Sequence, residues 1–88
     1  MDTYVYEERV LEELARHGLK PRASTSPQQL RDAVRDLYKY EIRRLRSELL
    51  ARRFRKQDYA GRVIELRRRY PLLSLPVEAW TVRKSEGE

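Results

Sequence analysis

Apolar residues recur at intervals of three and four along residues 26–53, which is the spacing of one face of an α-helix. Ser26 is a favourable cap residue, and Pro27 suits the first helical position, where its missing amide hydrogen costs nothing. No glycine or proline follows before Gly61. The pattern therefore predicts one helix over about residues 27–53, about 40 Å long at about 1.5 Å per residue. Its apolar stripe consists of Leu30, Val34, Leu37, Tyr38, Ile42, Leu45 and Leu49.

This helix is longer than a compact domain of 88 residues needs, because a domain of about 100 residues has a radius of gyration of about 13 Å. Either other segments of the chain pack along the whole stripe, or part of the stripe meets another chain. The sequence leaves both arrangements open.

Two carboxylates fall inside the apolar sector of this helix, Glu41 and Glu48. Arg44 and Arg52 lie close to them on the helical wheel. A carboxylate on a buried face must be paired or hydrogen-bonded, so one interpretation is a charge pair that fixes the register of an interface. The alternative is that the rim of the sector is wet at these positions.

A first helix is expected over about residues 3–17. Asp2 or Thr3 can cap it, and Gly18 supplies a left-handed stop. His17 precedes this stop and is interpreted as a surface residue near the negative end of the helix dipole. The apolar face consists of Val10, Leu11 and Leu14, which Tyr4 or Val5 can extend.

A third helix is expected over about residues 56–70. Phe54 and Tyr59 have the spacing of a hydrophobic staple around a cap at Arg55, which favours a break after the long helix. Arginine is a poor cap, however, and one continuous helix is the alternative. Around this break the chain resembles the short helical hairpins of small bacterial oligomerisation domains, and no family is assigned on it. The stripe is Tyr59, Val63, Leu66 and Tyr70, and Ile64 lies off it, which indicates a second neighbour.

The most apolar stretch of the chain is residues 71–82, which hold two prolines and cannot form a long helix. Ser74 followed by Pro76 allows a short helix over residues 75–80, and an extended strap is the alternative. In either form, Trp80 and the leucines are expected to cover the end of the helical core.

The predicted fold is therefore all-α. It is one domain over residues 1–88, a three-helix bundle-like arrangement with a long central helix, a short apolar C-terminal segment and a polar tail at residues 83–88.

Composition excludes several classes of function. The chain has no cysteine and one histidine, which rules out a disulfide framework and any cysteine or multi-histidine metal site. No apolar run approaches the length of about 20 residues that a membrane span needs, and Asp2 and Glu7 argue against a signal peptide. No catalytic motif is present. We therefore expect a cytoplasmic protein that is not an enzyme, with no cofactor, membrane partner or small-molecule substrate.

The net charge is +6, and arginine outnumbers lysine sixteen to four. Charge is unevenly placed: residues 1–14 carry −4 and residues 41–70 carry +7. Clustered basic side chains favour nucleic acid or another acidic partner, although Asp32 and Asp36 interrupt the row, and a solvated face is the alternative. The candidate contacts are Arg35, Lys39, Arg43, Arg46, Arg53, Arg62, Arg67, Arg68 and Arg69.

Taken together, these patterns predict a small basic interaction module. Its partner is expected to be another protein or a second copy of the chain, as in a homodimer, and nucleic-acid binding through the arginine-rich helical face is the alternative. The candidate interface residues are Tyr40, Glu41, Glu48, Ile64 and Trp80.

Overall fold

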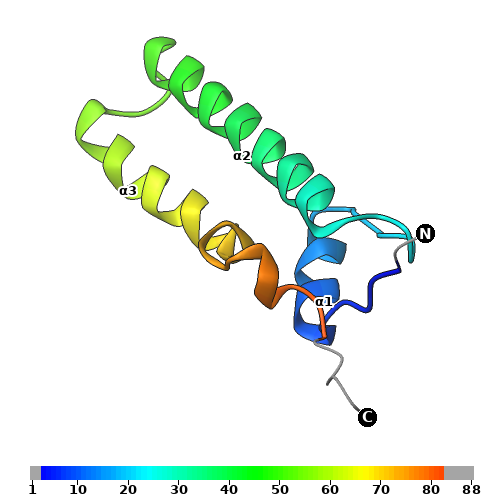
Figure 1. Ribbon diagram of the computed structural model, residues 1–88. Helices are drawn as coiled ribbons and strands as arrows, with labels where there is room; N and C mark the ends of the chain where they lie inside the picture. Colours follow the sequence, from blue (N-terminus) through cyan, green and yellow to red (C-terminus); the bar gives the residue numbers. More distant parts are fainter. Residues whose placement is uncertain (1–2, 83–88) are drawn as a thin grey trace.

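The computed structural model describes residues 3–82 and is mostly helical (Figure 1). This confirms the predicted helical class. The predicted cap at Asp2 and the predicted tail at residues 83–88 lie outside the described residues. In chain order the elements are α1 (Glu8–Arg16), α2 (Pro27–Leu50), α3 (Lys56–Arg68) and two short 3-10 helices, η1 (Pro71–Ser74) and η2 (Val77–Ala79).

The long helix α2 begins with a reciprocal cap. The Gln29 amide donates to the Ser26 hydroxyl at 3.2 Å, and the Ser26 amide donates to Gln29 Oε1 at 3.0 Å. These bonds satisfy amides that have no partner inside the helix, which is why the helix starts at Pro27.

The same helix ends at Leu50 rather than near Arg53. Arg52 turns the chain with a φ of 57°, a left-handed conformation that is reached here without glycine. The Arg53 amide then donates to the Glu48 carbonyl at 3.0 Å, which closes the helix end. After this turn, Arg55 is extended and precedes α3.

The first helix begins at Glu8, so the prediction of a start near residue 3 is wrong. The residues before it are extended because their backbone groups bond to a distant segment. Tyr6 forms an isolated antiparallel bridge with Thr81, and the Glu7 amide donates to the Trp80 carbonyl at 3.0 Å. A helix over these residues would lose both contacts.

The C-terminal segment forms neither a single short helix nor a plain strap. Pro71 is the first residue of η1, and Pro76 immediately precedes η2. A proline favours such starts because its φ is already close to helical and it has no amide hydrogen to satisfy. The chain then becomes extended at Thr81, where it pairs with Tyr6.

The core lies at one end of the molecule, where α1, η1 and η2 pack near the first half of α2. Trp80 belongs to this core with an exposed fraction of 0%, and its indole Nε1 donates to the Leu75 carbonyl at 3.1 Å. The prediction of Trp80 as an interface residue is therefore wrong, because the chain itself covers the ring. The other buried side chains are Tyr6, Val10, Leu14, Leu30, Val34, Leu66, Tyr70 and Leu72.

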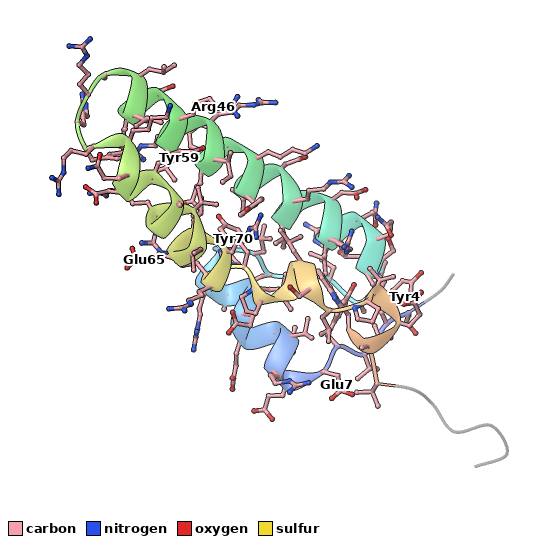
Figure 2. The ribbon with its side chains drawn as sticks, turned by 90° about the vertical axis from the view of Figure 1, so that its left-hand side faces the viewer. Tyr4, Glu7, Arg46, Tyr59, Glu65 and Tyr70 are labelled. Carbon is pink, nitrogen blue, oxygen red and sulfur yellow. The ribbon has the colours of Figure 1, made fainter. Side chains whose placement is uncertain are left out.

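The rest of the helical pair extends away from this core. We call residues 40–68 the arm: the second half of α2, the turn and α3 (Figure 1). Figure 2 shows Tyr59 out on the arm and Tyr70 where α3 approaches α1. The molecule measures 58 × 19 × 16 Å, and its radius of gyration is 16.4 Å, compared with about 12 Å for a compact domain of this length.

Candidate interaction surfaces of the arm

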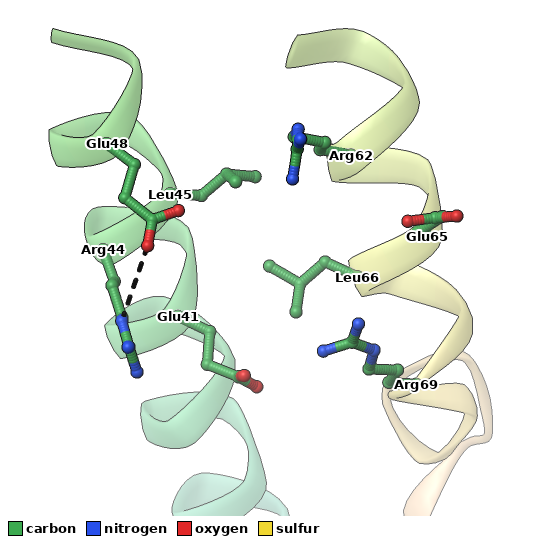
Figure 3. A pocket seen from close by; sticks show the side chains of 8 residues that line it. All are labelled: Glu41, Arg44, Leu45, Glu48, Arg62, Glu65, Leu66 and Arg69. Carbon is green, nitrogen blue, oxygen red and sulfur yellow. Dashed lines mark ion pairs between the residues drawn. The ribbon is translucent and has the colours of Figure 1, made fainter. Parts of the chain in front are cut away.

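A groove of about 230 Å³ runs between α2 and α3 on one side of the arm (Figure 3). Leu45 and Leu66 point toward each other across it. Its rim is charged, with as many acidic as basic residues, so the groove has no net charge. The lining residues are Glu41, Arg44, Leu45, Glu48, Arg62, Glu65, Leu66 and Arg69.

The charges on the two walls of the groove are complementary. Glu48 on α2 lies across from Arg62 on α3, and Glu41 lies across from Arg69 (Figure 3). Within α2, Arg44 Nε lies 3.8 Å from a carboxylate oxygen of Glu48. Opposite charges that flank an apolar seam favour one register of paired helices, as they do in coiled coils. The simplest role of this rim is therefore to align α2 with α3.

Glu41 is hydrogen-bonded where the groove reaches the core. The Tyr70 hydroxyl donates to the Glu41 carboxylate. A carboxylate inside the apolar sector of a helix needs a hydrogen-bond or ion-pair partner, and Tyr70 supplies one. The Tyr70 ring also contacts the edge of Tyr38, with ring centroids 5.3 Å apart. Burial raises the pKa of the Tyr70 hydroxyl well above its ordinary value, and the hydrogen bond to Glu41 raises it further.

His17 also packs in the cluster formed by Tyr38, Glu41 and Tyr70, and this position was not predicted from the sequence. Its ring stacks on Tyr70 with centroids 4.3 Å apart and an interplanar angle of 10°, and its Nε2 atom is buried without a hydrogen-bond partner among the described residues. The interpretation of His17 as a plain surface residue is therefore wrong. No local pattern reveals this contact, because the two rings meet only when α1 packs beside the end of α3.

Replacing Tyr70 with phenylalanine is expected to lower the free energy of unfolding at neutral pH by about 1 kcal/mol, because the bond to Glu41 is lost. The raised pKa also predicts a pH effect. The neutral hydroxyl contributes fully below its unfolded pKa of about 10, and this contribution is lost as the pH rises through the folded pKa. Urea unfolding from neutral to strongly alkaline pH measures both effects.

The alkaline loss of stability is expected to be smaller in Tyr70→Phe than in the wild-type protein. It is not expected to vanish, because burial also raises the pKa of Tyr6. Tyr40→Phe is the matched control, since the Tyr40 side chain is 63% exposed. Identical alkaline profiles for Tyr70→Phe and the wild-type protein would contradict the prediction.

The predicted basic contacts do not form one surface. Arg35 is paired with Asp32 at 3.0 Å. The Arg62 guanidinium lies 4.4 Å from the centre of the Phe54 ring, and Arg62 and Arg69 both line the groove. The remaining candidates are exposed: Lys39, Arg43, Arg46, Arg53, Arg67 and Arg68.

Several apolar side chains of the arm are open to solvent. Tyr40 and Ile64, both predicted interface residues, are 63% and 50% exposed. Leu50 is 77% exposed and was not predicted as an interface residue. Tyr59, which lies on the apolar stripe of the third helix, stacks on Phe54 with ring centroids 6.5 Å apart and is only partly buried.

The described part of the chain contains no cluster of acidic or histidine side chains that could hold a metal ion. Within residues 3–82, no helix is both long and apolar enough to cross a membrane. Comparison with known proteins gives no assignment. The chain matches no protein family model, no curated protein and no solved structure at a significant level.

Proposed function

We propose that this protein is a small, non-enzymatic interaction module that docks a protein partner along the arm. One observation carries this proposal. In the described chain, no residue between Val34 and Leu66 is buried, although apolar residues continue at helical spacing on both helices. These side chains are Ile42, Leu45, Leu49, Tyr59 and Val63.

The physical reason is the small contribution that a bare pair of helices makes to its own stability. Most helical stability in proteins comes from packing of the apolar face rather than from helix propensity. In the arm, each helix has only the other as a neighbour among the described elements. A partner that covers the partly exposed stripe would add buried apolar area, at about 25 cal/mol per Å².

We also propose how the elements of the fold divide their roles. The chain is one bundle-like domain of three helices, in which the apolar C-terminal segment covers the core and the arm is left for binding. The burial of Leu72 and Trp80 in that segment supports this division. No small-molecule substrate, cofactor or membrane forms part of the proposed function, and the cytoplasmic location stays a prediction from the sequence.

A photo-crosslinking residue placed at Leu49, which lies on the partly exposed stripe, tests the docking role in cells that produce the full chain. We expect it to form covalent adducts with another protein or a second copy. The matched control is the same residue at Leu11, which is 40% exposed on α1 and lies away from the arm. Adducts at Leu11 alone, or none at either position, would contradict the proposal.

A second copy of the chain is one candidate partner, and its association has a predictable salt dependence. Residues 41–70 carry a charge of +7, so two arms that pack together repel each other. Screening by salt shortens the range of this repulsion. Dimer formation through the arm is therefore expected to strengthen with salt, as measured by light scattering over a concentration series. Dimerisation that weakens with salt would exclude this arrangement.

Nucleic-acid binding is a second candidate function, and one observation favours it. Lys39, Arg43 and Arg46 are exposed on α2, and none of them is in an ion pair within residues 3–82. Binding to duplex DNA and single-stranded RNA across a salt series tests it, because phosphate contacts release counterions and give a steep salt slope. No binding at low salt, or binding without a salt slope, would exclude it.

A further inference from the structure

The arm has two sides with different surfaces. The groove defines one side through Glu41 and Glu48 of α2 and Glu65 of α3. Leu45 and Leu66 form the apolar seam between the two helices. A helical wheel at about 100° per residue shows which residues flank this seam on the side opposite the groove. We call this the open side of the arm. Its apolar centre consists of Ile42, Leu49 and Val63, and its basic edges are Arg46 on α2 and Lys56 and Arg67 on α3.

Acidic residues of the arm are confined to the groove side. Residues 41–70 contain four carboxylates. Three of them line the groove, and the wheel places the fourth, Asp58, toward the same side. Arg46 and Glu65 project from the arm in opposite directions (Figure 2). The groove side therefore carries all four carboxylates, while the open side has basic edges and no acidic residue.

The open side is also apolar along its centre. Ile42, Leu49 and Val63 are only partly buried. Ile42 packs against the edge of the core, whereas Leu49 and Val63 are not among the side chains that pack against it. Two antiparallel helices present a channel into which a third helix packs at an interaxial distance of about 8–10 Å. An amphipathic helix that lies in such a groove reads it through residues at i, i+3 or i+4, and i+7.

Charge decides between the possible occupants. A second copy that offered its own open side would bring like charges together along both edges. Nucleic acid would match the basic edges but would gain nothing from the apolar centre, since phosphate contacts need only the charges. A helix with an apolar stripe and carboxylates beside it matches both features at once.

We propose that the open side binds an acidic amphipathic helix of a partner protein. The apolar stripe of that helix packs on Ile42, Leu49 and Val63, and its carboxylates meet the basic edges of the arm. This docking rests on the proposed function, since it names the class of partner that the arm receives.

Binding of a synthetic probe to the full chain tests the proposal. The probe is a labelled helical peptide of leucine and glutamate with an apolar stripe at i, i+4 and i+7, and fluorescence anisotropy measures its affinity. A scrambled peptide of the same composition lacks the stripe. We expect the striped peptide to bind at least about tenfold more tightly than the scrambled one, and its binding to weaken as salt is added.

Matched charge reversals locate the binding surface. Arg46→Glu with Arg67→Glu reverses both edges of the open side and is expected to weaken striped-peptide binding at least about tenfold. Arg43→Glu with Arg68→Glu makes the same change in net charge at exposed positions that point away from the channel, and is expected to change it by less than about threefold. If the first variant does not keep its circular dichroism spectrum, Arg46→Gln with Arg67→Gln replaces it, with the same direction of effect.

The variant Leu49→Gln distinguishes binding of an apolar helix from binding of nucleic acid. It is expected to weaken binding of the striped peptide and to leave any binding of duplex DNA unchanged. Equal affinity for the striped and scrambled peptides, or equal effects of the two charge-reversal pairs, would overturn the proposal. Failure of the striped peptide while crosslinking at Leu49 still captures a protein would overturn this inference alone, whereas failure of both would overturn the proposed function as well.

Discussion

Replacing Trp80 with alanine is expected to lower the free energy of unfolding by about 3–5 kcal/mol. The side chain has an exposed fraction of 0%, so its removal loses apolar burial and leaves a cavity. The indole also donates to the Leu75 carbonyl at 3.1 Å, and that carbonyl would lose its partner. The free energy of unfolding of a small domain is only about 5–15 kcal/mol, so the variant is expected to be partly unfolded at physiological temperature.

Thermal and urea unfolding followed by circular dichroism measure this loss. Tyr40→Ala is the matched control, because it also removes an aromatic ring from the chain but at a position that is 63% exposed. Its expected effect is within about 0.5 kcal/mol. If Trp80→Ala costs no more than Tyr40→Ala, the C-terminal segment does not hold the core closed.

Leu30→Ala is expected to cost about 3 kcal/mol, and Leu49→Ala about 1 kcal/mol. The two leucines lie on the same apolar stripe of α2, so helix propensity contributes equally to both changes. They differ in their surroundings. Leu30 is 6% exposed in the core, whereas Leu49 lies on the arm and is only partly buried, so its removal leaves less of a cavity.

Urea unfolding of both variants checks this difference, and Leu50→Ala serves as a control for the substitution itself. Leu50 is 77% exposed, so its replacement is expected to change stability by less than about 0.5 kcal/mol. Equal losses for the Leu30 and Leu49 variants would mean that the arm is as tightly packed as the core. In that case the arm would have no apolar surface to offer a partner.

The difference between the two leucines bears directly on function. Surfaces that bind partners are drawn from the less stable parts of a protein. If Leu49 contributes little to folding but much to binding of the striped peptide, its place in the apolar stripe reflects a partner rather than the core. Leu30 would show the reverse pattern.

Some features of this protein could be predicted from short stretches of sequence. Ser26 and Pro27 predict the start of α2, and Gly18 has the left-handed φ of 75° that its place after α1 requires. These features depend on residues within a few positions of one another, since capping and backbone preference are local. Pro71 likewise predicts that the third helix ends before it, and α3 ends at Arg68.

Other features depend on contacts between distant segments and have no local signature. The extended residues before Glu8 carry a helical pattern, but their bridge to Thr81 outweighs helix propensity. The hydrogen bond from Tyr70 to Glu41 and the stacking of Tyr70 on His17 likewise join separate elements. The spacing of residues indicates which side of a helix is apolar, but it does not identify the neighbour.

By itself, then, the sequence determined the helical class, the start of α2 and the direction of the apolar stripe along α2. Only the tertiary structure decided that α1 and the C-terminal segment cover the first half of this stripe and leave the arm uncovered. It also decided that the acidic residues of the arm lie on one side and basic residues edge the other. The physical reason is that periodicity depends on neighbours along one helix, whereas burial and charge segregation depend on which helices lie side by side.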